Sequence, residues 1–188
     1  MLVASEERRG YVLCMQPDEG AFFETLLSSP QFGWTRCVQT LAELQGFVDE
    51  IGGPVVLISF CSDMIVPGTI IDRLAGECFN FHSGPPERPG YRPAAFAAVE
   101  GASSYGVTFH RMVAEIDAGP IYAVRRFDLQ SGMSEEEVSE LAYVHLLRLA
   151  TEVAGWVADP GHTFQPTGEV WGVSRTTKAD YRRVKGTR

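Results

Sequence analysis

Short apolar runs alternate along the chain with longer segments in which apolar residues recur every three or four positions. The runs at 10–15 and 34–39 predict two strands, and the segment near 20–28 predicts a helix between them. The run PVVLISF at 54–60 is continuous and rich in β-branched residues, which is typical of a strand covered on both faces of a parallel sheet. The pattern therefore indicates strands and helices in alternation.

A capping box marks one helix start. Thr40 and Glu43 can each bond the other's backbone N–H, which predicts a helix that runs to about Ile51. The remaining expected elements are a helix over 68–75, a short strand ending at Asn80, a helix over 94–101, strands over 105–113 and 120–129, and a segment over 158–188 that wraps the surface and ends in a short helix.

A second capping box, Ser134 with Glu137, opens the longest predicted helix, over 135–157. Because strands and helices alternate, we expect an α/β fold with a doubly wound, mostly parallel, Rossmann-like sheet in a single domain over 1–188. The strands at 105–129 are expected to add an antiparallel pair. The apolar stripe of the long helix is expected at Val138, Leu141, His145, Leu149, Val153 and Trp156.

Composition and charge narrow the possible functions. The 188 residues are 45% hydrophobic and carry a formal net charge of −8, which indicates a globular protein and argues against a nucleic-acid-binding surface. No apolar run reaches the roughly 18–20 residues that cross a bilayer. We therefore expect no membrane partner and a cytoplasmic location. The one basic cluster, at 175–188, is expected to be solvated.

Motifs for nucleotide phosphates do not follow the predicted strands. No G-x-G-x-x-G or G-x-x-x-x-G-K-[ST] is present, which argues against dinucleotide and P-loop binding. The first strand is followed by QPDEGAFF, in which Asp18 and Glu19 would repel a phosphate. The cysteines stand in or beside apolar runs with no C-x-x-C pair, which predicts buried free thiols and neither a disulfide nor a metal site. They are Cys14, Cys37, Cys61 and Cys78.

Polar side chains stand at a strand end in ECFNFHSGPPERPGYRP, residues 77–93. Asn80 and His82 flank Phe81, so alternation places both on one side of the strand. The prolines that follow predict a rigid loop. Asp117 lies about 35 residues further on, in an Asp-Ala-Gly-Pro turn. Each residue alone is typical of a structural role, such as bonding to nearby backbone or forming an Asx-turn.

Taken together, these residues give the chain a resemblance to the 10-formyltetrahydrofolate-dependent formyltransferases. That family carries an Asn-x-His motif, a proline-containing loop, a strand of the GVT-x-H type and an Asp-x-Gly-Pro turn. FNFHSGPPERPGYRP, YGVTFHRM and IDAGPI match this set in order and spacing. The likeness runs from about Val55 to Phe127 and is less clear toward both ends.

The resemblance implies that Asn80, His82 and Asp117 are catalytic. In formyl transfer an amine attacks the formyl carbon, and the carbonyl oxygen gains negative charge. The Asn80 amide and a protonated His82 would then be donors to that oxygen. An imidazole is largely neutral at pH 7, so Asp117 is expected to keep His82 charged and to accept the amine proton.

The resemblance also implies a reduced folate, 10-formyltetrahydrofolate, as the formyl donor. Its pterin ring is expected to bond backbone groups of two loops. The residues of the first loop could equally be buried in the core without binding a ligand. The residues concerned are Met64, Ile65 and Val66 in the first loop, and Glu115 and Ile116 in the second.

Several other polar residues have open roles. His110 also recurs in relatives, but a strand histidine is more often in the core or behind the site, and His145 is expected to be structural. Arg88 and Arg92 would contact an anionic substrate or the folate glutamate tail, or would simply be solvated. Asp18 would suit a cationic substrate. No metal is expected.

The expected acceptor is the amine of a small molecule, either an amino sugar or an amine such as hydroxyornithine. Given the 188 residues, we expect neither the nucleic-acid-contacting domain of the methionyl-tRNA enzymes nor the regulatory domain of the hydrolases. Glycinamide ribonucleotide formyltransferase and formyltetrahydrofolate hydrolase remain alternatives, as does an inactive folate-binding protein. The oligomeric state is open, with a homodimer as one possibility.

Overall fold

The computed structural model describes residues 9–28, 32–51, 55–74 and 77–186. Predicted boundaries at residues 54 and 75 and the last two residues of the tail lie outside these ranges. Within them, no helix is long and apolar enough to cross a membrane. The elements are β1 (Arg9–Cys14), α1 (Pro17–Leu26), β2 (Phe32–Val38), α2 (Leu41–Glu50), β3 (Val55–Phe60), α3 (Gly68–Arg73), β4 (Cys78–His82), α4 (Pro93–Glu100), β5 (Ser104–Arg111), β6 (Ile121–Asp128), α5 (Glu135–Ala158) and α6 (Lys178–Gly186).

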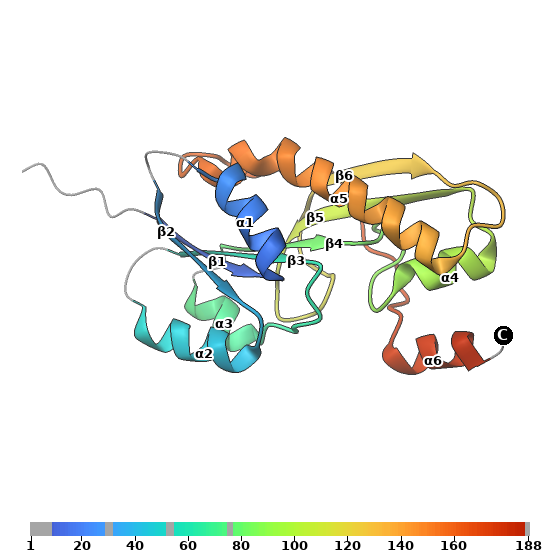
Figure 1. Cartoon of the computed structure of the whole chain (residues 1–188), viewed down its shortest axis with the longest axis horizontal. Coiled ribbons are helices and arrows are strands. Elements are labelled where there is room, and N and C mark those ends of the chain that lie inside the picture. Colours follow the sequence, from blue (N-terminus) through green and yellow to red (C-terminus); the bar gives the residue numbers. More distant parts are fainter. Residues whose placement is uncertain (1–8, 29–31, 52–54, 75–76, 187–188) are drawn as a thin grey trace, which may run out of the picture.

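One six-stranded sheet runs through the molecule in the order β2-β1-β3-β4-β5-β6 (Figure 1). The first four strands are parallel, whereas β5 pairs antiparallel with both β4 and β6. The fold class predicted from the sequence, a doubly wound and mostly parallel α/β sheet, is confirmed. The predicted antiparallel pair, which corresponds to β5 and β6, is confirmed as well.

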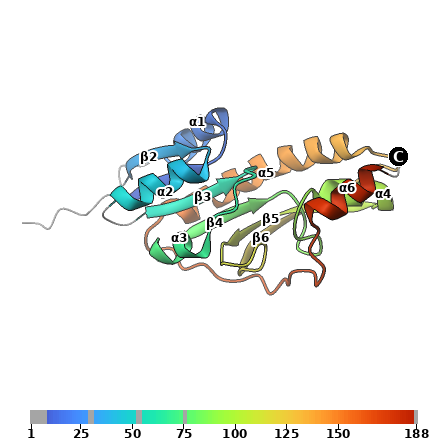
Figure 2. The ribbon, with the colours of Figure 1, turned by 90° about the horizontal axis from the view of Figure 1, so that it is seen from below.

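Helices cover both faces of the sheet (Figures 1 and 2). On one face, Tyr11 and Leu13 of β1 belong to an apolar cluster with residues of α1, α4 and α5. On the other face, Val12 and Cys14 belong to a second cluster with residues of α2 and α3. Strand β3 is buried along its whole length, as its continuous apolar run predicts.

Both predicted capping boxes are present. The Thr40 and Ser134 hydroxyls accept from the backbone N–H of Glu43 and Glu137, each at 3.2 Å. Helix α1 begins earlier than the predicted segment near 20–28, because Pro17 stands in its first turn, where a missing N–H costs nothing.

The buried face of α5 differs from the predicted stripe. Val138, Leu149 and Val153 are buried as expected, but Trp156 is 36% exposed. His145 is only half-buried and stacks on Phe127, with 4.0 Å between the ring centroids. The helix also packs through positions outside the predicted stripe, and three of these are alanines. The additional buried positions are Ala142, Leu146, Ala150, Ala154 and Val157.

The segment after α5 crosses from one face of the sheet to the other around the β6 edge. Phe164 packs on Phe79 and Tyr122, at ring-centroid distances of 4.8 Å each. The Thr167 N–H then donates to the Ile121 carbonyl at 2.9 Å, which pairs part of the exposed edge. Beyond this point the segment lies on the face that carries Asn80 and His82, as Trp171 contacts the His82 ring.

The described cysteines are free thiols. Cys14 and Cys78 are buried, as predicted, and Cys37 is partly buried. Cys61 is exposed, which corrects the expectation for that residue. It follows the last residue of β3, where the backbone turns through a positive φ of 48° and leaves the core.

We expect Ser134→Ala to lower the free energy of unfolding by about 1 kcal/mol, because the cap satisfies a backbone N–H at the start of the longest helix. Urea unfolding would measure this loss. Ser131→Ala, an exposed serine in the preceding turn, is the matched control. Equal effects of the two substitutions would contradict the role of the cap.

Candidate active site

The end of β4 carries two polar side chains on one face. Phe81 points into the core and packs on Phe60 and Phe109. Asn80 and His82 therefore point to the opposite face, as strand alternation predicts. Because β4 pairs with β5, Asn80 lies directly opposite His110. Their side chains meet, with 3.1 Å between Asn80 Nδ2 and His110 Nε2.

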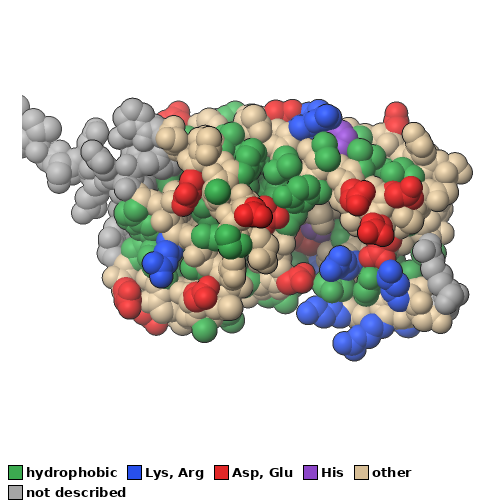
Figure 3. All heavy atoms as spheres, viewed as in Figure 1, with side chains coloured by type: hydrophobic (Ala, Val, Ile, Leu, Met, Phe, Trp, Pro, Cys, Tyr) green, Lys and Arg blue, Asp and Glu red, His purple; other side chains and the backbone are tan. Residues whose placement is uncertain are grey.

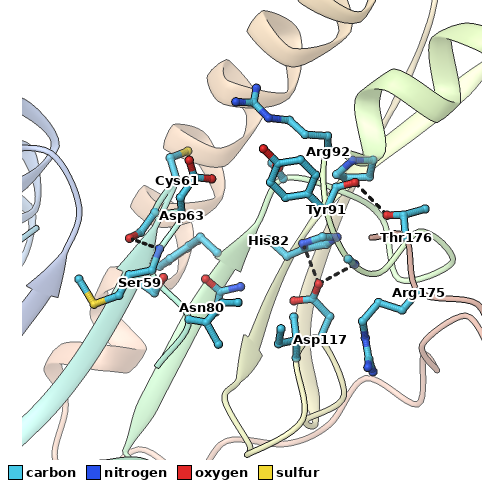
Figure 4. Close-up of a pocket in the computed structure, with 18 of the residues that line it drawn as sticks. Ser59, Cys61, Asp63, Asn80, His82, Tyr91, Arg92, Asp117, Arg175 and Thr176 are labelled. Atoms are coloured by element: carbon cyan, nitrogen blue, oxygen red, sulfur yellow. Dashed lines mark hydrogen bonds and ion pairs between the residues drawn. The ribbon is translucent and has the colours of Figure 1, made fainter. Parts of the chain in front are cut away.

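Asp117 reaches the same face from the loop between β5 and β6, and its carboxylate is buried (Figure 4). Its Oδ2 accepts from the Gly90 backbone N–H at 2.8 Å and lies 3.4 Å from Nδ1 of His82. Its Oδ1 lies 3.5 Å from Nε2 of His110. The structure thus brings Asn80, His82 and Asp117 together.

Three non-glycine residues with positive φ line the same cavity as these side chains. They are Cys61, Arg92 and Asp117, with φ values of 48°, 53° and 45°. This left-handed backbone conformation is unfavourable for residues with a Cβ and persists only where the surroundings impose it. Such residues are often found at functional sites, which makes this cavity the candidate active site.

His82 is held by two acceptors. Its Nε2 lies 3.0 Å from the Arg88 carbonyl oxygen, and its Nδ1 faces the Asp117 carboxylate. Burial lowers the pKa of His82, while Asp117 and the Arg88 carbonyl act in the opposite direction. Asp117 thus acts in the direction that the sequence predicts, but burial is the larger effect. A charged His82 stays a prediction.

The Asp117 carboxyl is ionised. Burial alone would raise its pKa, but the nearby His82, His110 and the Gly90 N–H together hold the pKa at about 2. A buried carboxylate is stable only when such partners surround it. At neutral pH the site therefore places a negative charge beside two imidazoles.

His110 connects the other residues of the site. Its Nδ1 lies 2.9 Å from the Arg111 carbonyl oxygen and must donate a hydrogen there, because a carbonyl can only accept. In the neutral ring Nε2 is then an acceptor, which matches the Asn80 amide N–H. His110 was expected in the core or behind the site. It is buried and contacts two of the three candidate catalytic residues.

A cavity of about 630 Å³ opens beside this cluster. All five residues expected to hold the folate line it: Met64, Ile65, Val66, Glu115 and Ile116. Figure 3 shows a hollow in this region with Lys and Arg side chains beside it, over α6. The polar lining on that side includes Tyr91, Arg92, Arg175, Thr176 and Lys178.

Of the three residues considered for substrate binding, the structure places one side chain at the cavity. Arg92 lines the cavity. Arg88 contributes its backbone carbonyl to His82, but its side chain pairs with Glu100 at 2.6 Å, away from the site. Asp18 is exposed in the first turn of α1 and is not among the lining residues. In the described part of the chain, no group of three His, Cys, Asp or Glu residues is placed to hold a metal.

Sequence reasoning missed the contribution of the C-terminal segment. Trp171 packs edge-on against His110 and His82, with ring-centroid distances of 4.8 and 5.6 Å. Arg175 and Thr176 line the cavity wall. The only local signal was a tryptophan in a proline- and glycine-rich tail, which does not by itself indicate what the residue contacts.

Comparisons with known proteins identify the family of this chain. Residues 3–143 match the protein family described as "Formyl transferase", which is well over half of the chain. The chain therefore belongs to the formyl transferase family. The match spans Asn80, His82 and Asp117.

Solved structures share the fold. A 4-N formyltransferase from Francisella tularensis superposes with a TM-score of 0.75 at 16% identity, over 94% of this chain and 78% of that one. The formyltransferase PseJ from Anoxybacillus kamchatkensis gives a TM-score of 0.70 at 18% identity, over 93% and 88% of the two chains. That protein was solved in complex with UDP-4,6-dideoxy-4-formamido-L-AltNAc and tetrahydrofolate.

Among curated proteins, a methionyl-tRNA formyltransferase from Sorangium cellulosum is 28% identical over 98 residues, which is 52% of this chain and 31% of that protein. A hydrogenase maturation factor, HoxX, from Bradyrhizobium diazoefficiens is 30% identical over 87 residues, 44% of this chain and 15% of that protein. The chain thus spans a third or less of the curated relatives it matches.

We expect acid to weaken the protein through Asp117. Its pKa is about 2 in the folded state against an ordinary 3.8, so its contribution is fully present above about pH 4 and is lost as the pH falls toward 2. Between these values, the wild type should lose about 2 kcal/mol more unfolding free energy than Asp117→Asn. Urea unfolding across this pH range measures the difference. Asp128→Asn, at the exposed end of β6, should keep the wild-type slope.

Proposed function

We propose that this chain transfers a formyl group from 10-formyltetrahydrofolate to the amine of a small-molecule acceptor. The observation that carries this proposal is the convergence of Asn80, His82 and Asp117 in one cavity of a formyl transferase family member. An amide donor, an imidazole and an ionised carboxylate are the groups that acyl transfer to an amine requires.

The cavity suits a reduced folate. Its volume, about 630 Å³, is typical of sites for cofactor-sized ligands. Ile65 and Ile116 are 62% and 43% exposed, so apolar surface is available to a flat ring. Val66 is buried in the core, so the packing alternative holds for its side chain and only its backbone can serve a ligand. When bound, 10-formyltetrahydrofolate would supply the formyl group.

Asn80 is suited to stabilise negative charge on an oxygen. Its amide nitrogen carries two hydrogens, and one of them is directed to His110 Nε2. The second is free to serve a reacting oxygen in the cavity. A single preorganised donor of this kind is typically worth roughly 2.7–4 kcal/mol in the transition state.

His82 and Asp117 are suited to hold a proton. A proton added to His82 at Nδ1 would face the Asp117 carboxylate at 3.4 Å, while Nε2 donates to the Arg88 carbonyl. The imidazole–carboxylate pair can therefore take up the proton that the amine loses, and that proton then resides on His82 Nδ1, where the Asp117 carboxylate stabilises the positive charge. Holding it in the site keeps it available for the leaving group.

For the acceptor, we propose an amino sugar carried on a nucleotide. Structural neighbours support this choice, including one from Shewanella that is described as a sugar N-formyltransferase. The loop after β1 is a poor phosphate site, because Pro17 has no N–H and the Gln16 N–H donates to Glu19 at 2.9 Å. This weighs against glycinamide ribonucleotide as the acceptor.

Positive charge stands elsewhere in the cavity. Arg92 and Lys178 both lie over the Tyr91 ring, 5.8 and 5.4 Å from its centroid, and Arg175 lines the same wall beside Glu115. These cations suit the diphosphate of a nucleotide-linked sugar. The proposal thus places the acceptor's anionic part at the C-terminal side of the cavity.

The decisive experiment supplies purified protein with 10-formyltetrahydrofolate and a panel of amines. Mass spectrometry would detect an acceptor that gains one formyl group. Nucleotide-linked amino sugars, free amino sugars, hydroxyornithine and glycinamide ribonucleotide form the panel. Formate release that needs no amine would identify a hydrolase, and neither product would leave an inactive folate-binding protein.

We expect reduced folate to stabilise the protein against heat. Ligand that binds only the native state adds about 2.7 kcal/mol at a hundredfold excess over Kd. For a chain of this size, that corresponds to a rise in Tm of roughly 5–10 °C. NAD and ATP are the negative controls. A well-folded sample with no shift in saturating 5-formyltetrahydrofolate would contradict the proposed donor.

We expect Asp117→Asn to lower kcat by roughly 10²–10⁴-fold with little change in folate affinity, because the carboxylate acts on the proton transfer. The double variant with His82→Asn should be scarcely slower than the slower single variant, because residues that act as one unit are not additive. Steady-state kinetics and folate titration measure both effects. Asp18→Asn, outside the cavity, is the matched control. Losses that multiply would mean that the two residues act separately.

A further inference from the structure

Two loops carry the buried carboxylate and its main-chain donor. Residues 112–120 carry Asp117, and residues 83–92 carry the Gly90 N–H that bonds it at 2.8 Å. A third segment, 171–176, lies against both of them. It comes from the C-terminal part of the chain, beyond the β6 edge (Figure 2).

Trp171 anchors this segment to the Asp117 loop. Its indole Nε1–H donates to the Gly119 carbonyl at 2.8 Å, two residues after Asp117. The edge of its ring system also contacts His82 and His110. One side chain therefore touches the loop that carries the carboxylate and both imidazoles that face it.

The rest of the segment is bonded to the proline loop. The Gly172 N–H donates to the Pro86 carbonyl at 2.8 Å. Thr176 donates its N–H to the Pro89 carbonyl at 3.0 Å and accepts from the Tyr91 N–H at 2.9 Å. These two bonds flank Gly90, which is the residue that donates to Asp117.

The contacts are too close for side chains at three glycines. A Cβ on Gly90 would lie 2.3 Å from the Thr176 carbonyl oxygen, and one on Gly172 would lie 2.6 Å from the Glu87 carbonyl oxygen. A Cβ on Gly119, the acceptor of the Trp171 bond, would lie 2.0 Å from the Arg111 carbonyl oxygen. At Gly90 and Gly172 the backbone of the segment is thus in direct contact with the proline loop, whereas at Gly119 the Asp117 loop lies directly against the end of β5.

We propose that segment 171–176 is a positioning element of the active site, and that Trp171 is its principal positioning residue. The segment holds the Asp117 loop against the proline loop. The Gly90 N–H, the Asp117 carboxylate and His82 therefore keep their relative positions. Trp171 also covers the two imidazoles against water. The kinetic part of this inference rests on the proposed function, but the part that concerns the histidines does not.

The contact of Trp171 with His82 should affect the pKa of His82, which can be measured. The groups that face its ring are Asp117 from the β5–β6 loop, His110 from β5, the Arg88 carbonyl from the proline loop and the uncharged Trp171. Burial lowers the pKa of His82. Opening the site at Trp171 admits water, so the pKa should rise toward its ordinary value.

Histidine titration by NMR tests this without any substrate. The four histidines have different aromatic neighbours, so their resonances can be separated. Trp171 contacts His82 and His110. Trp156 stacks on His162, and Phe127 stacks on His145. Trp171→Leu should shift the resonances of His82 and His110 and raise the pKa of His82, while those of His145 and His162 stay in place. Trp156→Leu is the matched control and should affect His162 alone. Unchanged titration of His82 in Trp171→Leu would overturn the proposal.

Kinetics separate positioning from simple packing. A displacement on the order of 1 Å can cost roughly 10²-fold in rate, so Trp171→Leu should lower kcat by about that factor with little change in KM for the folate. Trp171→Phe keeps an aromatic ring but removes the hydrogen bond to Gly119. Its kcat should lie between those of the wild type and Trp171→Leu.

Gly172→Ala keeps the indole intact and tests the contact of the segment with the proline loop. It should also lower kcat, whereas Gly155→Ala, on α5 with open space around it, should not. If Trp171→Leu does not fold, Trp171→Phe and Gly172→Ala still decide the question. Wild-type turnover in both, with native histidine titration, would overturn the proposal. Absence of formyl transfer in the wild type would instead count against the proposed function and leave the titration test intact.

Discussion

The buried carboxylate of Asp117 is the constraint on which the rest of the site depends. A charge taken out of water needs partners close by, and each partner here comes from a different part of the chain. The Gly90 N–H from the proline loop donates to it, and the rings of His82 from β4 and His110 from β5 lie 3.4 and 3.5 Å away, where a protonated ring would stabilise the charge. The positive φ of Asp117 and the tight packing at Gly90 follow from holding these groups around one side chain.

The antiparallel placement of β5 explains how Asp117 reaches the site. Arg111, the last residue of β5, pairs with Phe79 near the start of β4, so the following loop leaves the sheet away from His82. It must then turn back across the sheet face to bring its carboxylate to the imidazoles. The close approach of Gly119 to the Arg111 carbonyl marks this return. If β5 ran parallel to β4, that loop would instead leave the sheet at the end that carries His82, and no return across the face would be needed.

The sequence predicted the local features well, because local rules determine them. The capping residues Thr40 and Ser134 and the alternation of Asn80, Phe81 and His82 each depend on near neighbours, and the family motif added Asp117. Features set by distant contacts were missed. Trp171 bonds a carbonyl 52 residues away, and nothing in its own neighbourhood indicates that partner. The buried face of α5 was predicted incorrectly for a similar reason. Which of its residues are buried depends on how the helix packs on the sheet, and the helix sequence alone does not determine that packing.

The two histidines cannot serve the site in the same way. His110 donates from Nδ1 to the Arg111 carbonyl, and its Nε2 accepts from Asn80, so a proton at Nε2 would displace the amide. His82 faces the Arg88 carbonyl with one nitrogen and the Asp117 carboxylate with the other. A proton on its Nδ1 displaces no hydrogen bond and replaces a lone pair facing a negative charge. Burial opposes that proton and the carboxylate favours it. Protonation of His82 would therefore leave the hydrogen bonds of Asn80 and His110 in place, which is what the proposed function needs.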